Sequence, residues 1–257
     1  MYSTPLFFSL HPSSKFDMHK AYFNWSGGKD SALALYYALQ SNLNIQTLLT
    51  NVNAVHNRVS MHGVRRSLLE AQASAIGLPL CTIELPEQPL MSDYEQAVIQ
   101  KLTALKEANF DSAVFGDIFL EDLKQYREKQ LATVGFKAIF PLWKRNTTEL
   151  MHEFIDLGFK TVVVCIKAEV LDESFAGRVI DKDFLKDLPA QVDPCGENGE
   201  FHTFVYDGPI FKKSVAFTVG EKVFREYIAP KDNKDQCFSP QPQPANMGFW
   251  FCDLLLG

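Results

Sequence analysis

The first candidate site in this chain is a short run of small and charged residues. The run consists of Ser26, Gly27, Gly28, Lys29, Asp30 and Ser31. It follows an apolar segment, Ala21–Trp25, that is typical of a strand, and it precedes a helix that begins near Ala32. Unpaired backbone N–H groups at a helix N-terminus attract anions, and two glycines let an anion approach them closely. The ammonium of Lys29 and the two serine hydroxyls add further donors, so the sequence predicts a phosphate site.

A Walker A loop is another way to bind phosphate, but this run does not match it. That motif requires Gly-x-x-x-x-Gly-Lys followed by Ser or Thr. Phe23 stands five residues before Gly28, and Asp30 takes the place of the hydroxyl residue that would bind magnesium. We therefore expect a phosphate loop of a different kind.

A second group of candidate residues lies near the end of the chain. Glu197 and Glu200 flank the dipeptide Asn198-Gly199, which favours a two-residue hairpin turn because both turn positions need positive φ. Such a turn would pair the two glutamates directly, and like charges in that arrangement repel. A bound cation, a neighbouring Lys or Arg, or one carboxyl with a raised pKa would relieve the repulsion. Glu200 and His202 would share a face of the outgoing strand, where an acid and an imidazole can transfer protons.

These residues must be positioned by the elements around them, and the first half of the chain alternates between two patterns. Strands are predicted at Ala21–Trp25, Ile45–Val52, Leu80–Leu85, Ser112–Phe115 and Ala138–Trp143. Helices are predicted from near Ala32 and over His62–Ile76, Asp93–Glu107 and Leu120–Thr133. Strands that alternate with helices of this length indicate an α/β fold, a mostly parallel sheet with helices on both faces.

In such a sheet, ligands bind outside the carboxyl ends of the strands. The run at 26–31 follows the first strand, and Asn51 ends the second. Gly116 and Asp117 end the fourth strand, and Trp143 ends the fifth. We expect all of these residues to converge on one crevice.

The pattern changes after residue 145. A helix is predicted at Thr147–Leu157 and a β-branched strand at Lys160–Ile166, followed by a helix-poor stretch and the acidic run. We expect residues 1–17 to be a disordered extension and 18–145 to form a nucleotide-binding domain. Residues 146–228 would form a smaller α+β domain, and 229–257 a proline-rich linker with an apolar tail. The tail, Met247–Leu256, is predicted to pack back on the core, with a homodimer contact as the alternative.

Composition excludes several classes of protein. The chain has 257 residues, 46% of them hydrophobic, and a net charge of −6, which argues against broad binding to nucleic acid. No apolar run approaches the roughly 20 residues of a membrane span. The five cysteines show no Cys-x-x-Cys pair and no zinc spacing. A reduced cytoplasmic setting is the simplest account of them.

Several motifs together resemble one family. They are the run at 26–31, His62-Gly63-Val64, Gly116-Asp117-Ile118, Pro141-Leu142-Trp143 and the segment Gly196–Phe204. In this order they resemble the PP-loop ATP pyrophosphatases, also called adenine nucleotide alpha hydrolases, and among these the proteins related to diphthine–ammonia ligase. The resemblance covers residues 20 to 211 and implies a Rossmann-like sheet of the HUP type.

The resemblance also implies an activity, that of an ATP-dependent amide ligase. In that chemistry a substrate carboxylate attacks the α-phosphate of ATP, pyrophosphate leaves, and ammonia displaces AMP from the acyl-adenylate. Lys29 and the loop amides would neutralise the leaving pyrophosphate, and Asp30 would cap the helix or hold magnesium. Glu197, Glu200 and His202 would face the acyl group and handle ammonia or ammonium. The residues implied to contact nucleotide are the run at 26–31, Asn51, Gly116 and Asp117, and those implied to contact the acceptor are Trp143, Glu197, Glu200 and Thr203.

The acceptor carboxylate is not identified by the sequence; it could belong to a small molecule or to a protein side chain. The helix after Asp117 has less basic and aromatic character than we expect of diphthamide-making members, so a different carboxylate, such as a bacterial metabolite, is an alternative. A sulfurtransferase or tRNA-modifying enzyme would share the first motif, with Cys195 as its only support. A nucleotide-binding sensor would need that motif without the acidic run.

Overall fold

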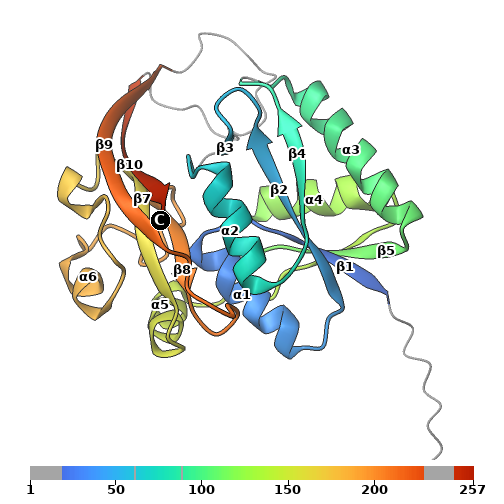
Figure 1. Ribbon diagram of the computed structural model, residues 1–257, viewed down its shortest axis with the longest axis horizontal. Helices are drawn as coiled ribbons and strands as arrows, with labels where there is room; N and C mark the ends of the chain where they lie inside the picture. Colours follow the sequence, from blue (N-terminus) through green and yellow to red (C-terminus); the bar gives the residue numbers. More distant parts are fainter. Residues whose placement is uncertain (1–18, 61, 88, 229–245) are drawn as a thin grey trace, which may run out of the picture.

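A computed structural model of the chain describes residues 19–60, 62–87, 89–228 and 246–257 (Figure 1). The predicted extension at 1–17 and the proline-rich stretch at 229–245 lie outside the described residues. The described chain forms two sheets, one from each half of the sequence.

The first sheet is mostly parallel and confirms the predicted α/β class. Its parallel strands are β1 (Lys20–Asn24), β2 (Ile45–Asn53), β4 (Leu80–Leu85), β5 (Phe110–Val114) and β6 (Lys137–Ile139). β1 pairs with β2 on one side and β5 on the other, while β4 extends the sheet beyond β2 and β6 beyond β5. A two-residue strand, β3 (Arg58–Val59), pairs antiparallel with the end of β2.

Helices cover both faces of this sheet because its strands are apolar on both sides. The helices are α1 (Lys29–Gln40), α2 (Arg66–Ile76), α3 (Met91–Glu107) and α4 (Glu121–Thr133). In β1, Tyr22 packs into the cluster formed with α3 and α4, whereas Phe23 packs into the cluster formed with α1 and α2. This alternation follows from the two-residue period of a strand.

The second sheet is antiparallel, with the strand order β8-β7-β10-β9. Its strands are β7 (Lys160–Lys167), β8 (Phe201–Asp207), β9 (Phe217–Ile228) and β10 (Asn246–Leu256). Three helical segments accompany it, namely α5 (Thr147–Asp156), the 3-10 turn η1 (Glu173–Phe175) and α6 (Lys182–Asp187). The apolar end of the chain therefore forms an inner strand of this sheet.

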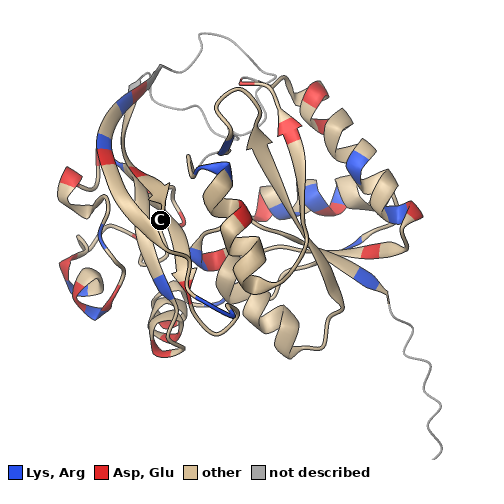
Figure 2. Ribbon diagram, in the orientation of Figure 1, with Lys and Arg blue, Asp and Glu red and all other residues tan. Residues whose placement is uncertain are grey.

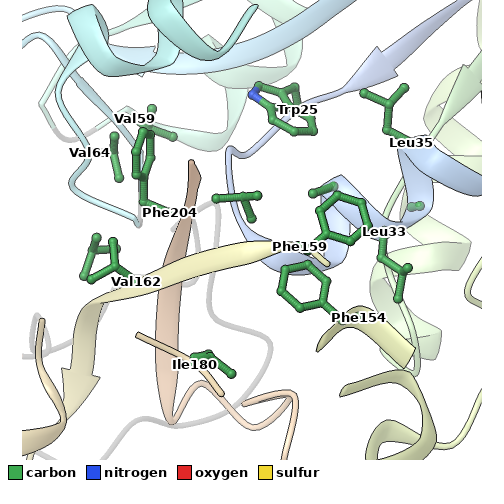
Figure 3. Packing of buried hydrophobic residues seen from close by; sticks show 14 of the residues in the cluster. Trp25, Leu33, Leu35, Val59, Val64, Phe154, Phe159, Val162, Ile180 and Phe204 are labelled. Carbon is green, nitrogen blue, oxygen red and sulfur yellow. The ribbon is translucent and has the colours of Figure 1, made fainter. Parts of the chain in front are cut away.

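One continuous apolar cluster joins the two sheets. It runs from Trp25 and Val59 in the first half to Val162 and Phe204 in the second (Figure 3). Helices α1 and α2 lie between the sheets, where α1 contacts β8 and α2 contacts β10 (Figure 1). The N-terminus of α1, with the predicted phosphate run, therefore lies at the junction of the two halves.

Two local predictions are wrong. The predicted strand Ala138–Trp143 is shorter, since β6 ends at Ile139 and a turn begins at Pro141. The predicted hairpin at Asn198-Gly199 does not form either, because no strand lies between α6 and β8 to pair across that turn. Gly199 has positive φ but Asn198 does not, so the turn lacks the two positive φ values that the hairpin needs.

Charge is spread over the surface in mixed fashion. Acidic and basic side chains are interspersed along α3 and α4, for example, without a segregated basic face (Figure 2). Within the described residues, no helix is long and apolar enough to cross a membrane.

Candidate active site

The phosphate run forms a tight loop that leads directly into α1. Gly27 has a φ of +81°, a conformation that other residues adopt only with strain, and Gly28 is the N-cap of the helix. The Ser26 and Ser31 hydroxyls are 3.0 Å apart, and the Gly28 N–H donates to Ser26 Oγ at 3.3 Å. Ser31 Oγ also donates to the Gly28 carbonyl. These bonds hold the loop in a closed turn at the positive end of the helix dipole.

Gln72 of α2 secures this loop and was missed by the sequence analysis. Its side chain is fully buried and donates to the carbonyls of Gly27 at 2.9 Å and Val205 at 2.6 Å. Its oxygen accepts a bond from the Trp25 indole. A Cβ on Gly27 would lie 2.7 Å from the Gln72 oxygen, so glycine is required here by contact as well as by φ. Only the burial of a glutamine in a helix could have signalled this role, and burial is not visible in the sequence.

Lys29 is almost fully buried, with only 3% of its surface exposed. Its ammonium contacts both carboxylate oxygens of Asp30, at 2.9 and 2.7 Å, and lies 5.5 Å from the centre of the Phe201 ring. Burial lowers the pKa of the Lys29 ammonium, but Asp30 and further acidic groups, including Glu197, outweigh burial and raise it. The ammonium therefore stays charged inside the site.

Strand β8 of the second sheet runs directly beside the loop. The Lys29 N–H donates to Thr203 Oγ1 at 3.0 Å, and the Val205 N–H donates to the Gly27 carbonyl at 2.9 Å. Thr203 is buried. The structure thus brings together the two motifs, and the contacting residues Lys29 and Thr203 are 174 residues apart in the sequence.

The acidic run forms a compact loop before β8. Glu200 is 4% exposed and accepts the backbone N–H groups of Asp193 at 3.0 Å and Asn198 at 2.8 Å, together with the Asn198 side-chain amide. Asp193 in turn accepts the N–H of Cys195 and the hydroxyl of Thr147. These contacts make Glu200 a support of the loop; a direct part in the reaction stays a prediction.

Glu197 occupies a different environment from Glu200. Burial, together with the nearby carboxylates of Asp30, Asp193 and Asp117, raises the pKa of its carboxyl to about 8 against the lowering effect of Lys29. A carboxyl with a pKa near neutrality can act as a general base or acid. A raised pKa was one of three ways in which the sequence could relieve repulsion between Glu197 and Glu200, but in the structure the raised pKa of Glu197 comes from burial and from the three aspartates.

His202 faces an imidazole rather than Glu200. Its ring lies against that of His62 in a tilted arrangement, with 4.7 Å between ring centres and 32° between planes. Burial and the neighbouring His62 and Lys29 lower the pKa of His202 to about 3. The sequence analysis noted His62 only as part of a motif, and nothing in its spacing indicated this pairing.

A pocket of about 130 Å³ opens beside the loop at the carboxyl ends of β1 and β2. Asn24, Asn51 and His62 are among the residues that line it. A smaller hollow of about 30 Å³ lies between Asn24, Asn51, Phe115 and Arg127. The placement of Asn51 agrees with the predicted crevice, whereas Asn24 was missed because a strand end alone carries no chemical signal.

The end of β5 packs against the start of α1. A Cβ on Gly116 would lie 2.9 Å from the backbone nitrogen of Ser31, so only glycine allows this approach. The next residue, Asp117, forms an ion pair with Arg127 of α4, with 3.1 Å between Oδ2 and Nε. Burial raises the pKa of the Asp117 carboxyl, Arg127 lowers it, and Asp30 raises it again. Asp117 therefore belongs to the charged surroundings of the loop.

Trp143 lies apart from these residues. Its described contacts are with Phe140 and with the ammonium groups of Lys124 and Lys144, which lie 5.3 and 5.9 Å from its ring. No described contact joins it to the phosphate loop, so its predicted role in substrate binding stays a prediction.

Comparison with known proteins links both halves of the site to one family. Residues 19–138 match the model of the diphthamide synthase N-terminal domain, and residues 146–232 match the model of the C-terminal domain. Relatives named diphthine–ammonia ligase include one from Danio rerio, 25% identical over 236 residues that span 84% of this chain and 89% of the relative. Those from Homo sapiens and Bos taurus are 25% and 26% identical over 221 residues, 77% of this chain and 82% of each relative. The family predicted from the motifs is confirmed: the chain belongs to the diphthamide synthase family.

Proposed function

We propose that this protein uses ATP to adenylate a substrate carboxylate and then transfers the acyl group to ammonia; the name of its relatives, diphthine–ammonia ligase, supports ammonia as the second substrate. One observation carries the proposal. The loop at the N-terminus of α1 and the acidic loop before β8 meet around Lys29. Asp30 of the first loop and Glu197 of the second both raise the pKa of the Lys29 ammonium. A nucleotide sensor would need only the first of these loops.

The phosphates of ATP fit the loop at 26–31. Gly27 and Gly28 carry no side chains to obstruct an anion, and the serine hydroxyls and α1 dipole favour negative charge there. Lys29 is charged and held within the site, so it can neutralise the charge that develops on the departing pyrophosphate. The pocket at Asn24 and Asn51 offers space on the same edge of the sheet for the rest of the nucleotide.

Magnesium would be held with the phosphates by Asp30, with Asp117 as a second carboxylate. Among the described residues, no group of three or more His, Cys, Asp or Glu side chains is arranged to hold a metal ion. That suits magnesium in ATP sites, where one or two carboxylates, water and phosphate oxygens share the coordination. Burial raises the pKa of Asp117 and the Asp30 carboxylate raises it further, and a cation between the two carboxylates would offset their repulsion. The metal would supply charge neutralisation at the phosphates.

The second half of the reaction needs a group that takes a proton from the attacking nitrogen. Glu197 suits this task, because its pKa of about 8 lets it hold or release a proton near neutral pH. Thr203 fixes the first N–H of α1 and so sets the position of the loop relative to β8. We assign Glu197 to proton transfer, and Glu200 to holding the loop that carries it.

Diphthine is the acceptor to test first, since the relatives carry its name. A transfer of sulfur is disfavoured by the state of Cys195. Its thiol is buried and lies 3.4 Å from the Thr147 carbonyl, and burial raises its pKa, so the reactive thiolate is suppressed.

The proposal is tested by following AMP and pyrophosphate from ATP in the presence of ammonium and either a diphthine-bearing protein or a panel of carboxylates. Replacement of Lys29 by Ala should reduce AMP formation at least about 100-fold, the scale on which charged groups stabilise such transition states. Lys182→Ala removes an exposed lysine of α6 and serves as the matched control. AMP formation by Lys29→Ala at the wild-type rate would contradict the assignment of the loop, and release of ADP would contradict adenylation.

A further inference from the structure

His62 has a buried nitrogen with no partner. Its Nδ1 atom is buried and makes no hydrogen bond within the described part of the chain. The backbone of Thr203 raises the pKa of the ring, as a carbonyl that accepts a ring N–H does, so we assign the ring proton to Nε2. An imidazole that donates from Nε2 leaves Nδ1 as a bare acceptor. Since a buried polar atom without a partner costs free energy, this acceptor points to a ligand.

The position of this nitrogen is set by the phosphate loop. A Cβ on Gly28 would lie 3.0 Å from His62 Cε1, the ring carbon to which Nδ1 is bonded. His62 also lines the pocket of about 130 Å³, together with Ser26 and Asn51. The bare acceptor therefore lies where the loop begins α1, beside the place that the phosphates of ATP would take.

The surroundings favour a neutral ligand. Burial and Lys29 lower the pKa of His62 to about 4, although the bond to Thr203 acts in the opposite direction. His202, which lies against it, is also neutral near pH 7. Two uncharged imidazoles beside a buried ammonium bind a neutral N–H donor better than a cation.

These observations rest on the proposed function for their chemical meaning. We propose that His62 Nδ1 accepts an N–H hydrogen bond from the ammonia that attacks the acyl-adenylate. The nitrogen lone pair forms the new C–N bond, and the bond between the acyl carbon and the AMP oxygen breaks with its electron pair on AMP. The proton that the nitrogen must lose passes to Glu197. His62 is thus a binding residue for ammonia, and His202 supports its ring.

Two substitutions separate the roles of the ring nitrogens. His62→Gln places an amide N–H near the position of Nε2 and keeps a donor for Thr203, but it removes the acceptor at the position of Nδ1. His62→Asn keeps an oxygen acceptor near Nδ1 and loses the donor. His152→Gln, at an exposed position of α5, is the matched control.

Steady-state kinetics with a diphthine-bearing protein, ATP and ammonium give the first readout. We expect His62→Gln to raise KM for ammonium about tenfold, the value of one hydrogen bond, while KM for ATP stays near that of the wild type. His62→Asn should recover part of the lost affinity, and His152→Gln should behave as the wild type. An unchanged KM for ammonium in His62→Gln overturns the proposal. A rise in KM for ATP instead of KM for ammonium also overturns it, because His62 would then be a nucleotide contact.

A second readout does not depend on the acceptor. In protein with ¹⁵N-labelled histidine, ammonium chloride at alkaline pH should shift the Nδ1 resonance that His62→Gln removes, whereas potassium chloride should not. No response to ammonium overturns the proposal even if the enzyme is active. Conversely, a response to ammonium in a protein that releases no AMP with any carboxylate would contradict the proposed function and leave the ammonia site standing.

Discussion

At the scale of single residues, the site depends on charges that burial brings together. The types of Lys29, Asp30, Glu197 and His202 could be recognised in the sequence because charged and imidazole side chains follow glycine-rich turns there. Their environments could not be recognised. Glu197 is perturbed by burial and by Asp30, and His202 by burial and by His62, and all of these effects arise from contacts across the two halves of the chain.

Glu197 predicts a pH-dependent stability. Its pKa is about 8 in the folded chain and near 4.5 when unfolded, so the folded state binds the extra proton. The stabilisation of the folded state by the extra proton on Glu197 is therefore fully present below pH 4.5 and is lost as the pH rises through about 8. Glu197→Gln, which cannot ionise, should melt about 2–4 °C above the wild type at pH 9 and within 1 °C of it at pH 4.5, after allowance for partial solvent screening. Equal melting temperatures at pH 9, measured by circular dichroism without nucleotide, would contradict the raised pKa.

The imidazole pair predicts the opposite dependence. The folded-state pKa values of His62 and His202 lie near 4 and 3, below the ordinary value of 6.5. Their contribution to stability is present above pH 6.5 and is lost as pH falls toward 4. When the pH falls from 7 to 4.5, the free energy of unfolding of His202→Gln should therefore decrease by about 1–2 kcal/mol less than that of the wild type. Urea unfolding at both pH values measures this difference, and parallel losses would show that the rings are not buried in neutral form.

At the scale of elements, the strands and helices of the first half were predictable because each has a clear apolar period and a glycine or proline boundary. The acidic loop was not, since Asn198-Gly199 is a strong local signal for a hairpin. The buried Glu200 carboxylate overrides that signal by accepting two backbone N–H groups, which fixes a loop instead. The hydrogen bonds between α2 and the phosphate loop could not be predicted either, because they depend on one buried side-chain amide.

Gln72 of α2 makes these hydrogen bonds with its side-chain amide. Gln72→Leu keeps the volume but leaves the Trp25 indole and the Val205 carbonyl without this partner. The free energy of unfolding should fall by about 3 kcal/mol, since each unsatisfied buried polar group costs about 1–3 kcal/mol. Gln46→Leu, at an exposed position of β2, is the control and should change stability by less than about 0.5 kcal/mol. A similar small effect of both substitutions would show that the loop is held by other contacts.

At the scale of the whole molecule, two sheets share one core, and the last strand joins them. β10 lies between β7 and β9, and its Asp253 bonds to Arg58 at 2.9 Å and to Arg65 at 2.5 Å, both in the first half of the chain. The sequence predicted that the apolar tail packs on the core. Its place inside the sheet could not be predicted, because the strand pairs with segments that are distant in the sequence.

Deletion of residues 246–257 should therefore abolish the second sheet rather than trim it. Without β10, β7 and β9 lose the strand with which both pair, and β8 loses the support that holds it against the phosphate loop. We expect a chain that is cleaved rapidly by protease after residue 145 and melts without a cooperative transition. Asp253→Asn, which removes only the charge, should keep the fold and cost about 1 kcal/mol. A truncated chain with native melting behaviour would contradict this role of β10.

The central claim is that the two loops around Lys29 make an acyl-adenylate. The most direct measurement uses an acceptor whose carboxylate is labelled with ¹⁸O, together with ATP and ammonium, and follows the label by mass spectrometry. Attack on the α-phosphate transfers one labelled oxygen to AMP, so the account predicts labelled AMP and unlabelled pyrophosphate. Labelled inorganic phosphate, with ADP as the second product, would show attack at the γ-phosphate and would contradict the account.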